Sequence, residues 1–171
     1  MTLGKYALLA QRTSRKEPGI DHMTNGVLGL IGEAGEVVET VKKWKFQSEH
    51  DVPMPVCKLI EELGDVMWYV VEFCRAINVS IEDLPVKDPF NRYDTLEQAS
   101  VGLMHSIMCT VLDGQEADIT DIISIIAHVS GILEDFCNVS LSDAMNVNIN
   151  KLMKRYPEGF DAERSQNRDA E

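Results

Sequence analysis

Apolar residues recur along the whole chain at helical spacing, and no segment shows the strict apolar–polar alternation of a half-buried strand. Six segments carry the helical spacing: 3–11, 25–46, 56–77, 94–112, 119–136 and 141–155. Breakers and polar residues separate these segments, as expected for loops. The pattern therefore predicts an all-α fold, a bundle of about six helices.

Capping residues mark several of the predicted helix ends. Thr24 or Asn25 is the expected N-cap of the second helix, and Ser140 is the expected N-cap of the last. Ser80 is placed to cap one short turn after the third helix. The polar tail 161–171 follows a proline and a glycine and is expected to fray.

One short run recurs within the chain. Asn78-Val-Ser returns as Asn138-Val-Ser 60 residues later, and two helices precede each copy. The recurrence predicts a diverged duplication of a helical pair. The alternative is that such a run is simply a common way to begin a helix. With the duplication, residues 1–160 form a single domain in which 85–137 is an inserted or degenerate repeat pair.

The composition agrees with a single folded domain. A chain of 171 residues that is 44% hydrophobic and 26% charged is long enough for one sizeable core and ordinary in its polarity. No apolar run reaches the ~18 residues of a membrane span. The first residues lack the apolar core and cleavage pattern of a signal peptide. We therefore expect a cytoplasmic protein without a membrane partner.

Charge and cysteine content limit the kinds of ligand and metal site that we expect. The formal net charge is −12, which works against a nucleic-acid partner because affinity for nucleic acids comes mostly from phosphate neutralisation. It leaves room for a small phosphorylated ligand whose charge is bridged by metal ions. The four cysteines are widely spaced without a CxxC motif, so we expect reduced core thiols and no zinc site.

Two acidic pairs lie on consecutive apolar helices. Glu33 and Glu36 are three residues apart, as are Glu62 and Asp65, and this spacing places each pair on one face of its helix. A proline-containing loop separates the two helices, and a helical hairpin would bring the pairs face to face. Four carboxylates there would repel one another and lose hydration. A hard divalent cation such as Mg²⁺, which prefers oxygen ligands and substrate phosphates, offsets both effects.

Glycines flank these acids. Gly32, Gly35 and Gly64 lie beside the proposed ligands, and each costs about 1 kcal/mol of helix stability relative to alanine. We expect them to let a ligand or the facing helix approach closely. The alternative is that the acids only face solvent, as we expect for Glu39 and Glu61. Spacing alone leaves the metal site and the solvated face as alternatives.

The two acidic motifs resemble those of a known family. LGLIGEAGEVVE followed by EELGDVMWYV is similar to the paired ExxE and ExxD signature of the all-α nucleoside triphosphate pyrophosphatases, the MazG-like family. NVNINKLMKRYPEGF resembles the closing segment of that family, so the likeness covers about 20–84 and 138–160. The resemblance implies a Mg²⁺-dependent enzyme, with Mn²⁺ as a substitute. Its expected reaction converts a nucleoside triphosphate, with metal-activated water, into the monophosphate and pyrophosphate.

The resemblance also implies roles for individual residues. The implied metal ligands and catalytic residues are the four acids: Glu33, Glu36, Glu62 and Asp65. The implied contacts to the nucleotide or its phosphates are near the two ends of the match: His22, Asn25, Asn148, Lys151, Arg155 and Tyr156. Trp44 and Tyr69 offer aromatic faces on which a base would stack. The alternative for each of these contact residues is a structural role, such as packing. For Lys151 and Arg155 it is a favourable interaction with the dipole at a helix C-terminus.

The chain departs from the simple family layout between 85 and 137. The counterparts of the four acids in the second helical pair are uncharged: Ser106, Cys109, Ile122 and Ile125. A second repeat that lost its metal site would serve as scaffold. One chain would then supply both halves of a bundle with a single active site, while a homodimer or higher homo-oligomer stays open.

Two further functions stay open at this point. The chain could be a helical regulatory or interaction protein that keeps the fold without hydrolysis. It could also be an enzyme that acts on dUTP, dUDP or an alarmone nucleotide. The presence of all four acids beside helix-weakening glycines favours an enzyme. Base and sugar preference do not follow from the sequence.

Overall fold

The computed structural model describes residues 1–16, 21–49, 51–82, 84, 93–113 and 117–166, in which all regular structure is helical. The helices are α1 (Leu3–Ala10), the 3-10 turn η1 (Gln11–Thr13), α2 (His22–Gln47), α3 (Val56–Ala76), α4 (Leu96–Asp113), α5 (Ile119–Cys137), α6 (Leu141–Arg155) and α7 (Ala162–Gln166). The all-α prediction is confirmed. The prediction of a frayed tail was wrong for α7, which is helical. The expected loops at 85–93 and 113–118 lie mostly outside the described residues.

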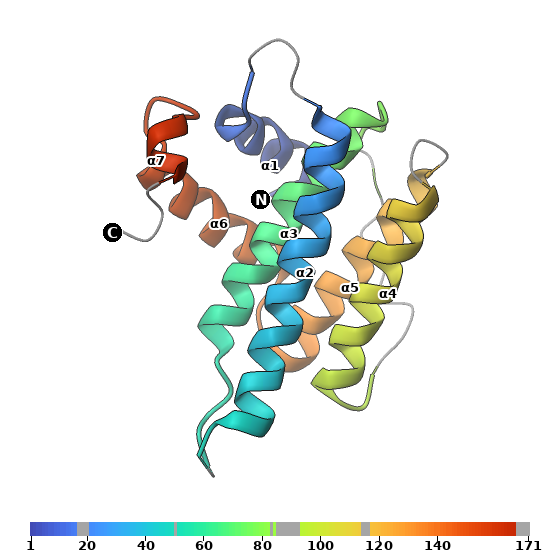
Figure 1. Cartoon of the computed structure of the whole chain (residues 1–171), viewed down its shortest axis with the longest axis vertical. Helices are drawn as coiled ribbons and strands as arrows, with labels where there is room; N and C mark the ends of the chain where they lie inside the picture. Colours follow the sequence, from blue (N-terminus) through green and yellow to red (C-terminus); the bar gives the residue numbers. More distant parts are fainter. Residues whose placement is uncertain (17–20, 50, 83, 85–92, 114–116, 167–171) are drawn as a thin grey trace.

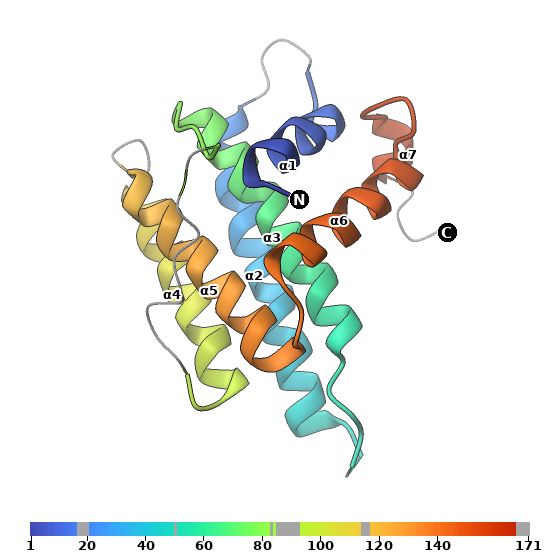
Figure 2. The same cartoon turned by 180° about the vertical axis from the view of Figure 1, so that it is seen from behind.

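Two antiparallel hairpins form the body of the protein. Figure 1 shows α2 and α3 side by side along the long axis, with α4 and α5 next to them. Helix α2 packs on α3 and α4, and α5 packs on α4 and α3. Helices α1 and α6 lie across α3 on the other side, as the view from behind also shows (Figure 2). Helix α3 therefore packs against α2 and α5 on one side and against α1 and α6 on the other.

Helix α3 is buried on most of its surface, which follows from this central position. Its apolar residues Leu59, Leu63 and Val66 have no exposed surface. Two acids on the same helix, Glu62 and Glu72, are also buried. Within the described part of the chain no single helix is long and apolar enough to cross a membrane, and only α5 and α6 taken together, bent by 98°, meet that criterion.

The start of α2 corrects one prediction. Asp21, and not Thr24 or Asn25, is the N-cap, so the helix begins at His22. The Asp21 carboxylate accepts the Thr24 backbone N–H at 2.9 Å and the Thr24 hydroxyl at 2.6 Å. The prediction that Ser140 is the N-cap of α6 is confirmed, because its hydroxyl accepts a backbone N–H from the first turn of that helix.

The two Asn-Val-Ser copies share one backbone conformation. Asn78 and Asn138 have positive φ angles of 57° and 54°; Asn138 directly follows α5, and Asn78 lies two residues after the end of α3. Asparagine is one of the few residues that tolerate this left-handed region. Ser80 and Ser140 then each accept a backbone N–H two or three residues further on. The matched helix ends support the duplication, which remains a prediction.

The cysteines divide into two kinds. Cys74 and Cys137 are buried, and burial raises the pKa of Cys74 to about 12 and that of Cys137 to about 11. Both therefore remain protonated core thiols, as expected. Cys57 and Cys109 are exposed, so the expectation of core thiols was wrong for these two.

Glycines set the distance between α2 and α3. A Cβ on Gly29 would lie 2.0 Å from the ring of Tyr69, so this ring lies directly against the α2 backbone. Gly64 is also crowded, as expected, by a side chain from α6. At Gly32 and Gly35, by contrast, no atom of the described residues lies within 4 Å of the added Cβ. The facing helix therefore does not require glycine at these two positions.

These contacts predict opposite effects of alanine at two glycines one turn apart. Gly29→Ala forces the Tyr69 ring away from α2, so we expect a loss of about 1–3 kcal/mol in the free energy of unfolding. Gly32→Ala meets no neighbour and should add up to about 1 kcal/mol through helix propensity. Urea unfolding of both variants measures the difference. Equal effects of the two substitutions would contradict the packing described here.

Candidate metal centre

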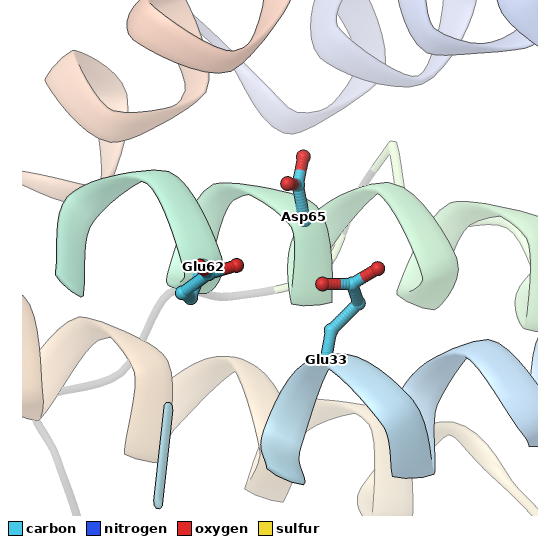
Figure 3. Close-up of side chains that lie close together, drawn as sticks. All are labelled: Glu33, Glu62 and Asp65. Atoms are coloured by element: carbon cyan, nitrogen blue, oxygen red, sulfur yellow. The ribbon is translucent and has the colours of Figure 1, made fainter. Parts of the chain in front are cut away.

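Three carboxylates carried by α2 and α3 lie close together. Glu33 points from α2 toward α3, which carries Glu62 and Asp65 (Figure 3). One oxygen atom from each of the three residues lies within 4.8 Å of the others. Glu62 is buried, while Glu33 and Asp65 are half-buried. Among the described residues this is the one group of acids, histidines and cysteines arranged to hold a metal ion.

The fourth predicted ligand lies outside this group. Glu36 is exposed and is not among the three clustered acids. Its charge nevertheless acts on Lys58, whose Nζ forms an ion pair with Glu62. The hydrogen bond to Glu62 raises the pKa of Lys58, and the charges of Glu62, Glu61 and Glu36 add to this shift. A metal-binding role for Glu36 therefore stays a prediction.

Helix α6 supplies two side chains that bind Asp65. The Asn148 Nδ2 donates to Asp65 Oδ1 at 2.7 Å, and the Lys151 Nζ lies 2.5 Å from Asp65 Oδ2. Both residues were expected to contact the nucleotide or its phosphates. The structure places both on an acid of the cluster, where they fix the carboxylate's orientation and offset part of its charge, and their contact with a nucleotide stays a prediction.

A buried tyrosine from α1 completes this chain of hydrogen bonds. The Tyr6 hydroxyl donates to Asn148 Oδ1 at 2.8 Å and lies 3.2 Å from the carbonyl oxygen of Gly64. Burial, and secondly the charge of Asp65, raises the pKa of Tyr6 well above its ordinary value, so the hydroxyl remains a donor. Because its oxygen accepts from Tyr6, the Asn148 amide must present its NH₂ group to Asp65. The sequence did not identify Tyr6, since its apolar spacing indicates only a core residue.

Two neighbouring cavities lie near the carboxylates. The smaller, of about 70 Å³, is lined by Glu33, Asp65 and the predicted contact residues Arg155 and Tyr156. The larger, of about 450 Å³, is lined by His22 and Asn25, so these two predicted residues also face a cavity. Five residues line both cavities: Thr13, Trp68, Tyr69, Phe160 and Ser165. The two cavities therefore adjoin along these five residues, and two acids of the cluster, Glu33 and Asp65, line the smaller one.

The aromatic residues of the site differ in part from those predicted. Tyr69 lines both cavities, and its ring meets that of Trp68 edge to face with centroids 4.8 Å apart. Trp44 lies elsewhere, near the loop between α2 and α3, where its N–H donates to the carbonyl of Val52 at 3.0 Å. Trp68 was missed because the sequence placed it in the apolar stretch of α3.

The C-terminal segment also contributes to the site. Ser165 of α7 and Phe160, just before it, line both cavities. The Arg164 guanidinium donates to the carbonyl of Arg155 at 3.1 Å, which attaches α7 to the end of α6. Residues 160–165 thus form a wall of the site, although the sequence predicted a polar tail from 161 onward.

Another cavity lies away from the acids, between α4 and α5. Its volume is about 780 Å³, and its lining includes Ser106 and Cys109. These are the counterparts of Glu33 and Glu36 in the predicted duplication. The second hairpin therefore has a cavity at the corresponding place on α4, but no group of carboxylates among the residues that the structure describes.

Comparison with known proteins agrees with the resemblance seen in the sequence. Residues 22–86 match the family model described as "MazG nucleotide pyrophosphohydrolase domain". The chain is also similar to the Gene 37 protein of Mycobacterium phage L5, with 36% identity over 62 residues. That alignment covers 36% of this chain and 52% of the phage protein, so this chain spans about half the length of the curated relative. No solved structure shows a significant match.

The geometry predicts which acids bind a divalent cation. Glu33→Gln, Glu62→Gln and Asp65→Asn each remove a charge from the cluster, and each should weaken Mn²⁺ binding at least tenfold, measured by titration calorimetry. Glu39→Gln is the matched control on α2, because Glu39 pairs with Lys42 and Lys43 on the same helix. Equal affinity for Mn²⁺ in all four variants would contradict the site.

Tyr6 is expected to act on the metal centre through Asn148. Tyr6→Phe keeps the buried ring but removes the hydroxyl, so the Asn148 amide loses its orienting partner. We expect Mn²⁺ affinity to fall about tenfold, at the lower end of the range for partners of metal ligands. Thermal unfolding of the same variant separates this effect from a loss of folding. Unchanged affinity in the folded variant would show that Asp65 needs no such support.

Proposed function

Since residues 22–86 match the model of the MazG nucleotide pyrophosphohydrolase domain, we propose that the protein hydrolyses a ribo- or deoxynucleoside triphosphate to the monophosphate and pyrophosphate in a Mg²⁺-dependent reaction. The observation that carries the proposal is the meeting of Glu33, Glu62 and Asp65 within 4.8 Å beside two adjoining cavities. Two aromatic residues, Trp68 and Tyr69, line both cavities, so acids and aromatic rings follow one another as phosphates and base do in a nucleotide.

The donor set fits magnesium. Mg²⁺ takes hard oxygen ligands, combines a few carboxylates with phosphate oxygens and water, and shares this chemistry with Mn²⁺. Glu33, Glu62 and Asp65 would hold the ion, with Glu36 near enough to act on the same surroundings through Lys58. A divalent cation bound there would screen the phosphate charge and make water a better nucleophile.

The cations beside the cluster suit a triphosphate. Lys151 contacts Asp65, and Arg155 lines the smaller cavity next to the same acid. A lysine ammonium on a flexible stem can donate to a carboxylate and a phosphate oxygen together. We therefore assign Lys151 and Arg155 to the phosphates, where they stabilise the negative charge that develops on the departing pyrophosphate.

Hydrolysis at the α-phosphorus accounts for the products. The oxygen of water forms a bond to the α-phosphorus, and the bond from this phosphorus to the α–β bridging oxygen breaks. The bridging oxygen leaves with pyrophosphate, and the proton of the attacking water passes to a carboxylate of the cluster. This assignment gives the acids a role in the transfer of a proton in addition to metal binding.

The alternatives make different demands on the site. A regulatory helical protein would not need three converging carboxylates whose mutual repulsion must be offset. An enzyme for dUTP, dUDP or an alarmone nucleotide would use the same acids, and the geometry of the acids does not distinguish these substrates. A homodimer or higher homo-oligomer likewise remains open beside the single-chain bundle.

A nucleotide panel tests the proposed reaction. Ribo- and deoxynucleoside triphosphates are incubated with and without Mg²⁺, and the phosphate product is identified by ³¹P NMR. We expect pyrophosphate release that requires Mg²⁺, falls at least a hundredfold in Glu62→Gln and persists in Glu39→Gln. Release of orthophosphate, or no turnover across the panel, would overturn the proposal.

A further inference from the structure

A second buried acid lines the larger of the two adjoining cavities. Glu72 is 1% exposed and lines the larger cavity, two turns of α3 beyond Asp65. Its Oε2 accepts a hydrogen bond from the Ser14 hydroxyl at 2.8 Å. Its Oε1 is buried without a hydrogen-bond partner among the described residues, although the Arg75 Nη1 lies 3.6 Å away. An acid this deeply buried normally has all its oxygens satisfied, so the unpaired oxygen calls for an explanation.

His22 holds a second unpaired atom beside it. The Arg75 Nη2 lies 2.9 Å from His22 Nε2, and a guanidinium can only donate, so Nε2 accepts. The neutral ring then carries its proton on Nδ1, which is buried without a hydrogen-bond partner in the described structure. This Nδ1 lies 3.5 Å from Glu72 Oε2. One unpaired acceptor and one unpaired donor therefore lie close together on two residues that line the same cavity.

The distance from the metal cluster indicates which part of a nucleotide reaches them. Glu72 follows Asp65 by seven residues, so the two lie about 10 Å apart along α3. A ribose hydroxyl stays closer than this to the phosphate on its own sugar, whereas the edge of the base extends further. Trp68 and Tyr69 lie between the two acids on α3 and line both cavities, as stacking partners of a base would.

We propose that Glu72 and His22 select the base of the nucleotide. The Oε1 of Glu72 accepts a hydrogen bond from an N–H of the base, and the His22 Nδ1–H donates to the acceptor next to it. A pairing edge that places an N–H beside an acceptor atom is what the nucleobases offer, through either an amino or a ring imino group. Arg75 acts as a positioning residue, because it fixes the His22 tautomer. The inference rests on the proposed function for the location of the phosphates.

Equilibrium binding of analogues that cannot be hydrolysed tests this inference without requiring turnover. In the amino arm, α,β-methylene CTP is compared with its analogue lacking the 4-amino group. In the imino arm, α,β-methylene UTP is compared with its N3-methyl analogue. We expect loss of the N–H to weaken binding about tenfold or more in one arm, which identifies the group, because Glu72 accepts it as a charged partner. In Glu72→Gln this ratio should fall below about threefold.

Matched variants separate base selection from a structural role of Glu72. Ser14→Ala removes the hydrogen bond to Oε2 and the one that Ser14 accepts from Arg75 Nη1, but it leaves Oε1 and the contact of Arg75 Nη2 with His22, so the ratio between paired analogues should persist. If Glu72→Gln does not fold, His22→Ala serves in its place, because His22 lies at the partly exposed start of α2. This substitution removes the neighbouring donor. It should lower the affinity for the better analogue of each arm but not the affinity for tripolyphosphate. Thermal unfolding of each variant accompanies the titrations.

Two outcomes would overturn the inference. The first is a ratio near one in both arms for the unsubstituted protein. The second is a Glu72→Gln variant that weakens every analogue and tripolyphosphate alike, because a purely structural residue would have that effect. Failure of the proposed function gives a different result, since a protein that binds with base selectivity but releases no pyrophosphate would leave the role of Glu72 intact.

Discussion

The repulsion among three carboxylates held between two helices is the constraint on which the rest of the structure depends. Glu33, Glu62 and Asp65 lie within 4.8 Å of one another, and like charges this close, partly removed from water, destabilise the folded chain unless cations offset them. The fold provides two such cations from opposite sides: Lys58 on α3 pairs with Glu62, and Lys151 on α6 pairs with Asp65. The contact between α6 and α3 therefore stabilises the fold through an ion pair as well as through apolar packing. Tyr6 extends the same arrangement to α1, because it orients the amide that binds Asp65.

Much of this arrangement follows from local sequence, and the rest depends on contacts between distant segments. Helical spacing and breakers determine the helices, and the two acidic pairs on consecutive helices indicated the site, because both features act over a few residues. The rotation of α2 about its own axis is different. It is set by packing such as that of Tyr69 against Gly29, and it decides that Glu33 joins the cluster while Glu36 remains exposed. Spacing alone makes these two glutamates equivalent.

The sequence failed to identify Tyr6 and Trp68 for the same reason. Tyr6 and Trp68 have the spacing of core residues, and only their hydrogen bonds to Asn148 and Thr13 distinguish them from packing side chains. Glu72 did leave a signal, since it is a lone acid within the apolar run WYVVEFC of α3. An acid on a buried helix face requires either partners or a ligand, and here the partners leave one oxygen unsatisfied.

The two hairpins differ in their buried residues: the first buries acids that suit a functional site, and the second buries apolar residues that stabilise the fold. The hairpin of α2 and α3 buries Glu62 and Glu72 and contains Gly32 and Gly35, which no neighbouring side chain among the described residues requires, and each of these features lowers the stability of the fold. In the hairpin of α4 and α5, the predicted counterparts of Glu62 and Asp65 are Ile122 and Ile125, both fully buried. Each buried isoleucine stabilises the fold by about 1.5–3 kcal/mol relative to an exposed one. If the chain arose by duplication, loss of the acids from the second hairpin removed a site and added core, and the gain in stability offsets part of the cost of the acids that remain in the first.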